Sequence, residues 1–159
     1  MNEKTDITFK TDRGIFNYRV AALIISSGKI LIMKDDEVSH YYLPGGRVKM
    51  QERAEDAILR ELKEELKIDA NVIRPLWLDQ NFFGTESSRF HELCIYFLTD
   101  VAHSNICREQ RFTVQENSTL HIFEWKSFNE LKNENFYPTF LKEKIEVLPE
   151  HFMLVTEKE

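Results

Sequence analysis

Two neighbouring apolar runs mark the first third of the chain. Residues 17–36 (NYRVAALIISSGKILIMKDD) contain two runs rich in aliphatic residues, separated by the polar sequence SSGK. Short apolar runs that flank turn residues are typical of paired strands. The pattern predicts a β-hairpin here, a polar lead-in over 1–14 with a short strand at Ile7–Lys10, and a short strand over 40–48 that runs into a Pro-Gly-Gly loop.

The second half of the chain repeats this strand pattern. Residues 69–83 and 88–102 are rich in β-branched and aromatic side chains, and a polar stretch beginning at Gly84 separates them. Such a pair predicts a second hairpin. Residues 119–125 (TLHIFEW) predict a further strand, and residues 151–156 (HFMLVT) predict a last strand or a docked tail.

Helical signals lie between and after these strands. Arg53–Leu66 has apolar residues at helical spacing, Ser127 is a suitable N-cap for a short helix over 127–135, and Pro138 suits the first turn of a helix over 138–148. Strands, helix, strands and helices in that order predict a mixed sheet covered by helices on two faces. We find no internal repeat or linker, so residues 1–159 are expected to form one domain.

The central helix carries an unusual acidic cluster. At about 100° of rotation per residue, Ala54, Ile58 and Leu62 define an apolar arc. Glu61 and Glu65 fall inside or at the edge of that arc. A carboxylate on the buried side of a helix is costly unless it is paired or binds a metal. The residues leave both explanations open: a divalent cation, or an arginine or lysine partner supplied by the fold.

The sequence before the helix favours the metal. Gly46 is followed after five residues by Glu52, and after seven more by the sequence RELKEELKI, which begins at Arg60. This spacing resembles the signature of the Nudix hydrolase family: Gly, five residues, Glu, seven residues, then Arg-Glu-aliphatic-x-Glu-Glu-x-Gly-aliphatic. Every signature position matches except the late glycine, which is Lys67. That position is expected just past the helix end in a left-handed conformation, so we expect an altered loop but intact metal ligands.

The resemblance implies a fold, a cofactor and a reaction. The fold would be a Nudix-type α/β/α sandwich with a mixed sheet between helices. The activity would be hydrolysis of a nucleoside diphosphate linked to another group, by metal-assisted attack of water on phosphorus. The cofactor would be Mg²⁺, with Mn²⁺ as the alternative ion. The implied catalytic residues are Glu52, Arg60, Glu61, Glu64 and Glu65, and the implied metal ligands are the Gly45 carbonyl, Glu61, Glu64 and Glu65.

Outside this signature, the sequence offers only candidates. Glu92 and Glu116 are candidates for a general base or an extra ligand, and Arg89 and His91 for substrate contacts, against the alternative of ordinary surface side chains. Arg19 is expected either in the cleft or in solvent. Three further residues are candidates for stacking on a base, although with twelve Phe a core position is the stronger expectation: Tyr41, Phe82 and Phe83.

The composition excludes some classes of binding partner and indicates the cellular compartment. A net charge of -6 argues against non-specific nucleic-acid binding and against an anionic membrane surface. The two cysteines, Cys94 and Cys107, have no metal-ligand spacing and are expected to be reduced thiols, and we find no signal peptide or apolar span. The expected setting is the cytoplasm and the expected substrate a small nucleotide derivative, with a homodimer left open.

Two other functions remain open at this point. A Nudix fold without catalysis would act as a nucleotide-binding or sensor module, although such a module need not keep a complete set of acidic ligands. An acidic-helix interaction protein would need neither the Gly-Gly pair nor the spacing from Glu52 to Arg60. Metal-dependent stabilisation separates this last function from the others, and turnover separates the enzyme from the binding module.

Overall fold

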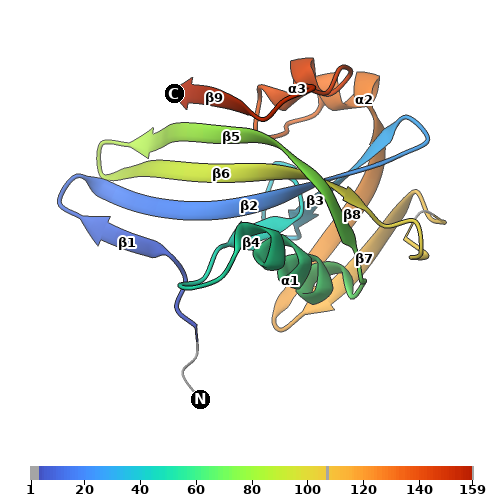
Figure 1. Cartoon of the computed structure of the whole chain (residues 1–159), viewed down its shortest axis with the longest axis horizontal. Helices are drawn as coiled ribbons and strands as arrows, with labels where there is room; N and C mark the ends of the chain where they lie inside the picture. Colours follow the sequence, from blue (N-terminus) through green and yellow to red (C-terminus); the bar gives the residue numbers. More distant parts are fainter. Residues whose placement is uncertain (1–3, 107, 159) are drawn as a thin grey trace.

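A mixed β-sheet forms the centre of the protein in the computed structural model, which describes residues 4–106 and 108–158. The main path of the sheet is β7-β8-β3-β2-β6-β5-β9, and β1 and β4 both pair with β2 (Figure 1). In chain order the elements are β1 (Thr8–Thr11), β2 (Gly14–Ser26), β3 (Lys29–Asp35), β4 (Gly45–Arg47), α1 (Ala54–Leu66), β5 (Asn71–Thr85), β6 (Ser88–Asp100), β7 (Arg111–Glu116), β8 (Thr119–Ser127), α2 (Phe128–Asn133), α3 (Leu141–Lys144) and β9 (Met153–Lys158).

Strand β2 is the junction of the sheet. It pairs with β3 through only two partners, Ile25–Ile30 and Ser26–Lys29, next to the predicted turn. It then runs parallel to β6, from the pair Ile15–Phe90 to the pair Ile24–Thr99. The predicted hairpin therefore exists, but its two strands diverge at once because β2 takes β6 as its main partner.

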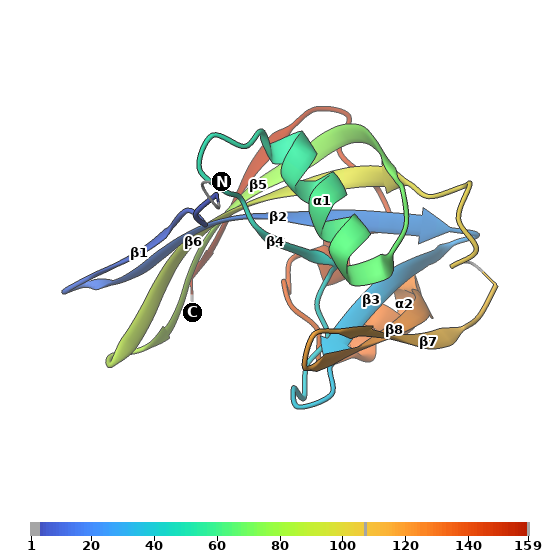
Figure 2. The ribbon, with the colours of Figure 1, turned by 90° about the horizontal axis from the view of Figure 1, so that it is seen from below.

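The helices cover both faces of this sheet. Val20 and Ala22 of β2 join the apolar side chains of α1 in one core cluster. The alternate β2 residue Leu23 joins Leu131 of α2 and Leu141 of α3 in a second cluster on the opposite face. This alternation follows from the period of two along a strand. The predicted α/β arrangement, a mixed sheet between helices, is confirmed (Figure 1, Figure 2).

Helix α1 follows its apolar arc. Ala57, Ile58, Leu62 and Leu66 are buried, and so is Glu65. Arg53 is the N-cap residue, so the predicted start is correct to one position. The expected burial of a carboxylate on the apolar side of this helix is therefore present in the structure.

Two predictions of local structure were wrong, and one strand was missed. The expected Pro-Gly-Gly loop is instead strand β4, which pairs with Arg19–Ala21 of β2. Strand β7 was not predicted. The expected helix over 138–148 contains only the four residues of α3, and the chain around it forms turns before Pro149, which cannot donate a helical hydrogen bond.

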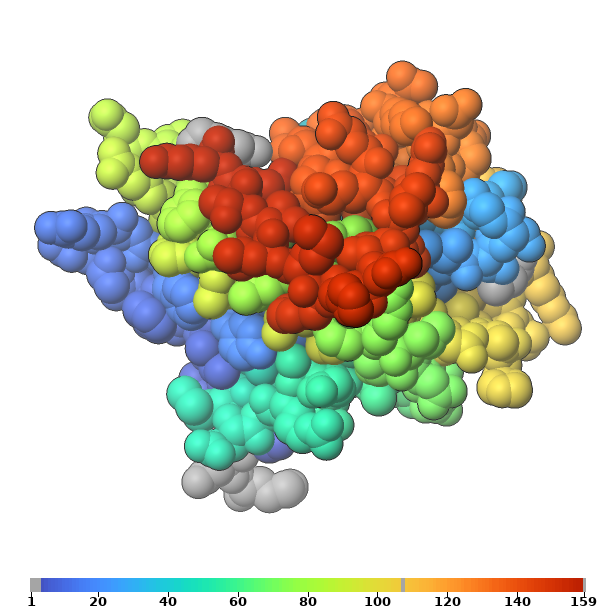
Figure 3. Space-filling model, turned by 45° about the horizontal axis from the view of Figure 1, so that its top comes forward, coloured from blue at the N-terminus to red at the C-terminus, as the bar shows by residue number. Residues whose placement is uncertain are grey.

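Two hairpin tips project from one side of the molecule. They belong to β1–β2 and to β5–β6, and in Figure 3 they appear in blue and yellow-green beside the red C-terminal residues, whose strand β9 pairs with β5. Cys94 is a buried free cysteine, and Cys107 lies outside the described residues. In the described part of the chain, none of the helices has both the length and the apolar character needed to span a membrane.

Candidate active site

Two carboxylates lie at the junction of α1 and β4. Glu65 is only 5% exposed, and its Oε2 atom is buried without a hydrogen-bond partner. Burial raises the pKa of Glu65 well above its usual range, and the charge of nearby Glu61 adds to this rise. Burial also raises the pKa of Glu61, against the opposing effect of Arg60. A buried carboxylate with an unpartnered oxygen, next to a second, half-buried carboxylate, calls for a cationic partner.

The Gly45–Gly46 pair makes this arrangement sterically possible. A Cβ atom on Gly46 would lie 2.3 Å from the Cδ atom of Glu61, and one on Gly45 would lie 2.1 Å from the carbonyl oxygen of Val20. The first glycine therefore lets β4 lie against β2, and the second lets the Glu61 carboxylate lie against β4. The sequence predicted close backbone approach here, and the structure places it within a strand.

The backbone of Gly45 faces the carboxylates. Flanking hydrogen bonds run from Ala22 N to Pro44 O and from Val48 N to Tyr18 O, so Gly45 occupies a position of the β2–β4 ladder that is not hydrogen-bonded to β2. Its N–H donates to Glu65 Oε1 at 3.2 Å. Because the N–H and C=O of an extended residue point to the same side, the Gly45 carbonyl is also directed away from β2.

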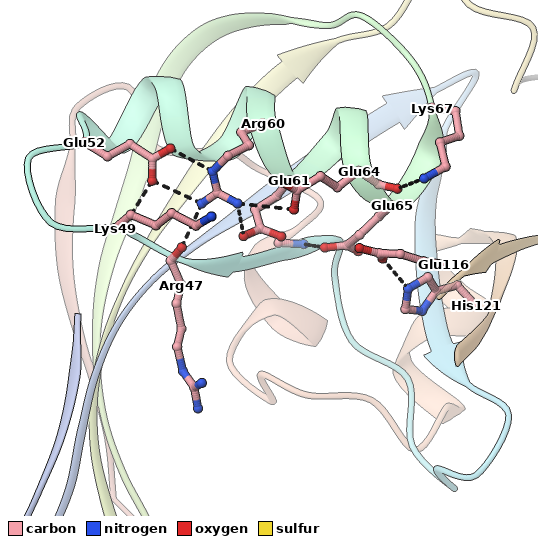
Figure 4. A network of polar contacts seen from close by, with 11 residues as sticks. Arg47, Lys49, Glu52, Arg60, Glu61, Glu64, Glu65, Lys67, Glu116 and His121 are labelled. Carbon is pink, nitrogen blue, oxygen red and sulfur yellow. Dashed lines mark hydrogen bonds and ion pairs between the residues drawn. The ribbon is translucent and has the colours of Figure 1, made fainter. Parts of the chain in front are cut away.

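Arg60 connects the acidic residues in a single network (Figure 4). Its Nε donates to Glu52 Oε1 at 2.7 Å, and its Nη1 donates to Glu61 Oε1 at 2.8 Å and to Glu64 Oε2 at 3.3 Å. Its Nη2 also donates to the Arg47 carbonyl. The hydrogen bond from Arg60 lowers the pKa of Glu52. Glu52 therefore faces Arg60, and Arg60 fixes the position of the Glu61 carboxylate.

Lys67 occupies the position of the missing signature glycine. Its backbone is left-handed, with φ 59° and ψ 31°, and its N–H bonds the Lys63 carbonyl. Its Nζ donates to the Glu64 carbonyl at 2.6 Å. The lysine thus keeps the helix end that the glycine would favour and provides a donor for one of the last carbonyls.

A cleft of about 360 Å³ opens beside Glu61 and Glu65, and Glu116 lines it as well. His121 connects Glu116 to a third element. Its Nε2 lies 2.7 Å from Glu116 Oε2, and its Nδ1 lies 2.7 Å from Asp35 Oδ1 of β3. His121 is only 8% exposed, so this chain of contacts holds the Glu116 carboxylate at the cleft (Figure 4).

These residues suit a hard divalent cation. The donors are carboxylate oxygens and a backbone carbonyl, which such ions prefer, and the Glu65 Oε2 atom has no hydrogen-bond partner of its own. Across residues 4–106 and 108–158, no three acidic, His or Cys side chains already converge as a preformed metal cluster. Glu61 instead bonds Arg60, and Glu65 bonds Gly45. A cation would have to draw the carboxylates together against their mutual repulsion.

Several of the other candidate residues lie away from the carboxylate cleft. Arg89 lies at the exposed tip of the β5–β6 hairpin, and His91 contacts Phe16 and Phe82. None of these four residues lines the carboxylate cleft or the pocket beside it. The Tyr41 hydroxyl donates to Glu124, and the Tyr41 ring lines neither cavity.

Arg19, Glu92 and Phe83 lie closer to the carboxylates. Arg19 lines both the carboxylate cleft and a larger adjoining pocket, and Glu92 and Phe83 line the adjoining pocket. His121 was missed by the sequence reasoning. Its alternation with Phe123 and Trp125 along one face of a strand was the available signal for a buried histidine.

Comparisons with known proteins agree on one family. The NUDIX domain model matches residues 16–147. An RNA pyrophosphohydrolase from Campylobacter jejuni subsp. doylei is 33% identical over 102 residues, which cover 55% of this chain and 65% of that protein. The chain thus spans just under two thirds of the length of this curated relative.

Solved structures share the fold. A UDP-X diphosphatase aligns with a TM-score of 0.62 at 21% identity, covering 86% of this chain and 66% of its own. A mutator MutT protein from Bacillus halodurans aligns with a TM-score of 0.62 at 11% identity, covering 89% of each chain. Identities this low establish the architecture and nothing finer.

Proposed function

This chain belongs to the Nudix family, and on that premise we propose that it hydrolyses the pyrophosphate bond of a nucleoside diphosphate linked to another group. The observation that carries the proposal is the buried Glu65 carboxylate, which has an unpartnered oxygen and lies beside Glu61 at a cleft. A structural ion pair would have given Glu65 an arginine or lysine partner. A cation held by carboxylates supports phosphoryl chemistry instead.

The proposed cofactor is Mg²⁺, with Mn²⁺ as the alternative. Glu61, Glu65, Glu64 and the Gly45 carbonyl would hold it. When bound, the ion would act as a Lewis acid that neutralises charge on the phosphate oxygens. Arg60, fixed by Glu52, would keep Glu61 in place.

Glu116 is the proposed proton acceptor for the attacking water. Its carboxylate lines the same cleft and is held from behind by His121. Glu92 is farther along the adjoining pocket, where we propose that it contacts substrate. A cytoplasmic location and a small nucleotide substrate also belong to the proposal.

The test is product release from a panel of nucleotides, with and without Mg²⁺. The panel includes nucleoside triphosphates, UDP-linked compounds, dinucleoside polyphosphates and RNA with a 5′ pyrophosphate, because the relatives named above are an RNA pyrophosphohydrolase and a UDP-X diphosphatase. Metal-dependent turnover of one class is expected.

Glu65→Gln should lower kcat by at least about 100-fold, since it removes charge where a cation is held. Glu55→Gln, on the more exposed first turn of the same helix, is the matched control and should keep full activity. Binding of Mn²⁺ without turnover of any panel member would instead establish a binding or sensor module.

A further inference from the structure

A second, larger pocket adjoins the carboxylate cleft. It has a volume of about 630 Å³, which suits a nucleoside-sized ligand. Arg19 and Tyr42 line both cavities. A molecule that places its phosphates over Glu61 and Glu65 therefore extends directly into this second space, which we call the aromatic pocket after its walls.

The walls of the aromatic pocket are flat rings. Tyr42, Phe83, Tyr96 and Tyr137 line it together with His40, whose ring lies 5.3 Å from that of Tyr137. Flat aromatic faces stack on nucleobases, since each base also has a π-face. The walls therefore suit the base of a nucleotide better than a flexible chain.

The floor of the pocket presents hydrogen-bond acceptors. Asn81 of β5 and Glu92 of β6 are directly opposed in the ladder, so their side chains lie on the same face of the sheet. The Oδ1 atom of Asn81 is buried and has no hydrogen-bond partner. Glu92 accepts one weak bond, from Asn17 Nδ2 at 3.3 Å, and its Oε1 is 3.9 Å from Arg19 Nε.

These two acceptors have fewer donors than they can accept: Asn81 Oδ1 has none, and Glu92 has one long hydrogen bond. A buried acceptor without a donor is costly, so the pair favours a ligand that brings N–H groups. Asp35 also lines the pocket but already contacts His121 and accepts from the Tyr42 hydroxyl. The acceptors still available to a ligand are therefore those of Asn81 and Glu92.

A single cationic side chain stands at the boundary between the two cavities. Among the described residues that line the aromatic pocket, Arg19 is the one arginine or lysine. It makes only a long contact to Glu92, which leaves guanidinium donors for an anion. Its place between the cleft and the pocket suits the phosphate nearest the nucleoside.

We propose that the aromatic pocket binds the nucleobase of the substrate and selects bases that carry an exocyclic amino group. Asn81 and Glu92 accept hydrogen bonds from that group, and Arg19 contacts the adjacent phosphate. Adenine, guanine and cytosine offer such donors. Uracil presents a carbonyl oxygen where cytosine has its amino group, and hypoxanthine presents one where adenine has its amino group; each oxygen would face acceptors and be repelled. Hypoxanthine has only a C–H where guanine has its amino group, so it would lack the donor. That the ligand is a nucleotide rests on the proposed function. The preference for an amino group rests only on the acceptors of the aromatic pocket.

The first test is direct binding of nucleoside monophosphates, measured by calorimetry on the full chain without any hydrolysis. Each comparison changes one amino group: GMP against IMP, AMP against IMP, and CMP against UMP. The amino-bearing member of each pair should bind at least roughly 10-fold more tightly, as expected for a hydrogen bond to a charged acceptor. Equal affinity within all three pairs, or tighter binding of the members that lack the amino group, would overturn the proposal.

Variants locate the selectivity. Glu92→Gln keeps the side-chain size but adds an N–H donor, and Asn81→Leu removes the unpartnered acceptor. In each variant, the ratio of the two affinities within a nucleotide pair should fall close to one. Gln80→Leu, one position along on the other face of β5, is the matched control and should keep the preference. Circular dichroism checks that each variant folds, and an unchanged preference in folded Glu92→Gln would remove that residue from the site.

The base-binding proposal and the proposed hydrolase function can be refuted independently of each other. Selective binding without turnover would sustain the base pocket while refuting the hydrolase. Metal-dependent turnover with no base preference would sustain the hydrolase while refuting the pocket.

Discussion

At the scale of single residues, Gly46 sets how closely α1 approaches β4. Its missing side chain leaves the space that the Glu61 carboxylate occupies. Gly45 faces backbone instead, at the Val20 carbonyl. Gly46 therefore makes room for a carboxylate of the candidate site, whereas Gly45 allows two strands of the sheet to approach.

Gly46→Ala should therefore damage the site more than the fold. The new methyl displaces the Glu61 carboxylate and no backbone, so we expect a stability loss of about 1 kcal/mol or less but at least a ~10-fold loss of Mn²⁺ affinity. Gly45→Ala should instead unfold the protein, because its methyl meets backbone. Manganese titration and urea unfolding check both, and wild-type Mn²⁺ affinity in Gly46→Ala would contradict the proposed site.

Lys67 gives a second prediction at this scale. Its left-handed backbone strains any residue with a Cβ atom, so Lys67→Gly should stabilise the protein by about 0.5–1 kcal/mol despite the loss of the Lys67 bond to the Glu64 carbonyl. Lys63→Gly, exposed within the same helix, should destabilise by about 1 kcal/mol. Urea denaturation measures both, and a shift of the same sign in both variants would argue against strain at Lys67.

At the scale of elements, the β7–β8 hairpin completes the cleft. It supplies Glu116 from β7 and His121 from β8, and His121 reaches Asp35 on β3. The hairpin and α1 therefore both supply acidic side chains to the cleft, and the histidine fixes the Glu116 carboxylate that lines it.

Removing that histidine should affect both stability and metal binding. His121→Leu leaves the Glu116 and Asp35 carboxylates without their shared partner, so we expect a loss of about 1–3 kcal/mol and a weaker Mn²⁺ affinity. His91→Leu is the control, because His91 is exposed near the hairpin tip. Unchanged Mn²⁺ affinity in folded His121→Leu would show that Glu116 needs no such support.

The elements differ in how well the sequence predicts them. Helix α1 and the β5–β6 hairpin follow from local periodicity, and the angle calculation placed Glu61 and Glu65 on the inner side of α1. Strand β4 does not follow, because glycines leave no pattern of polar and apolar side chains. The parallel pairing of β2 with β6 joins residues 75 positions apart, which no local signal encodes. The aromatic pocket depends on that pairing, so it was not predictable either.

At the scale of the whole molecule, a buried carboxyl group and a half-buried one join the last strand to its neighbour. Asp79 of β5 is 1% exposed and contacts Glu157 of β9. Burial, together with the Glu157 charge, raises the pKa of Asp79 to about 8. Glu157 also accepts from Thr139 Oγ1 and Phe140 N, so a proton shared between Asp79 and Glu157 would help to hold β9 and the neighbouring loop together.

This pair makes stability depend on pH in a defined direction. Because the pKa of Asp79 is about 8 when folded and 3.8 ordinarily, the folded chain binds the extra proton between those values. Stability should fall as the pH rises through that window, by up to ~1.4 kcal/mol per unit from this group, and then level off.

Asp79→Asn should remove the slope that Asp79 contributes to the free energy of unfolding as a function of pH, when urea unfolding is measured at pH 5, 6, 7 and 8. Thr139→Val, which removes a hydrogen bond but no titrating group, should lower the whole curve without changing its slope. Equal slopes in Asp79→Asn and the wild type would show that the pair shares no proton.

The parallel β2–β6 ladder also has a consequence for synthesis on the ribosome. Each β2 residue in that ladder pairs with a β6 residue that is synthesised 75 residues later, after α1 and β5. Until β6 emerges, the nascent chain carries an apolar strand with an open edge, which is a template for misassociation. A truncated chain that ends before Ser88 is therefore expected to aggregate or to occupy a chaperone, and pulse-labelled nascent chains of increasing length would show release near the completion of β6.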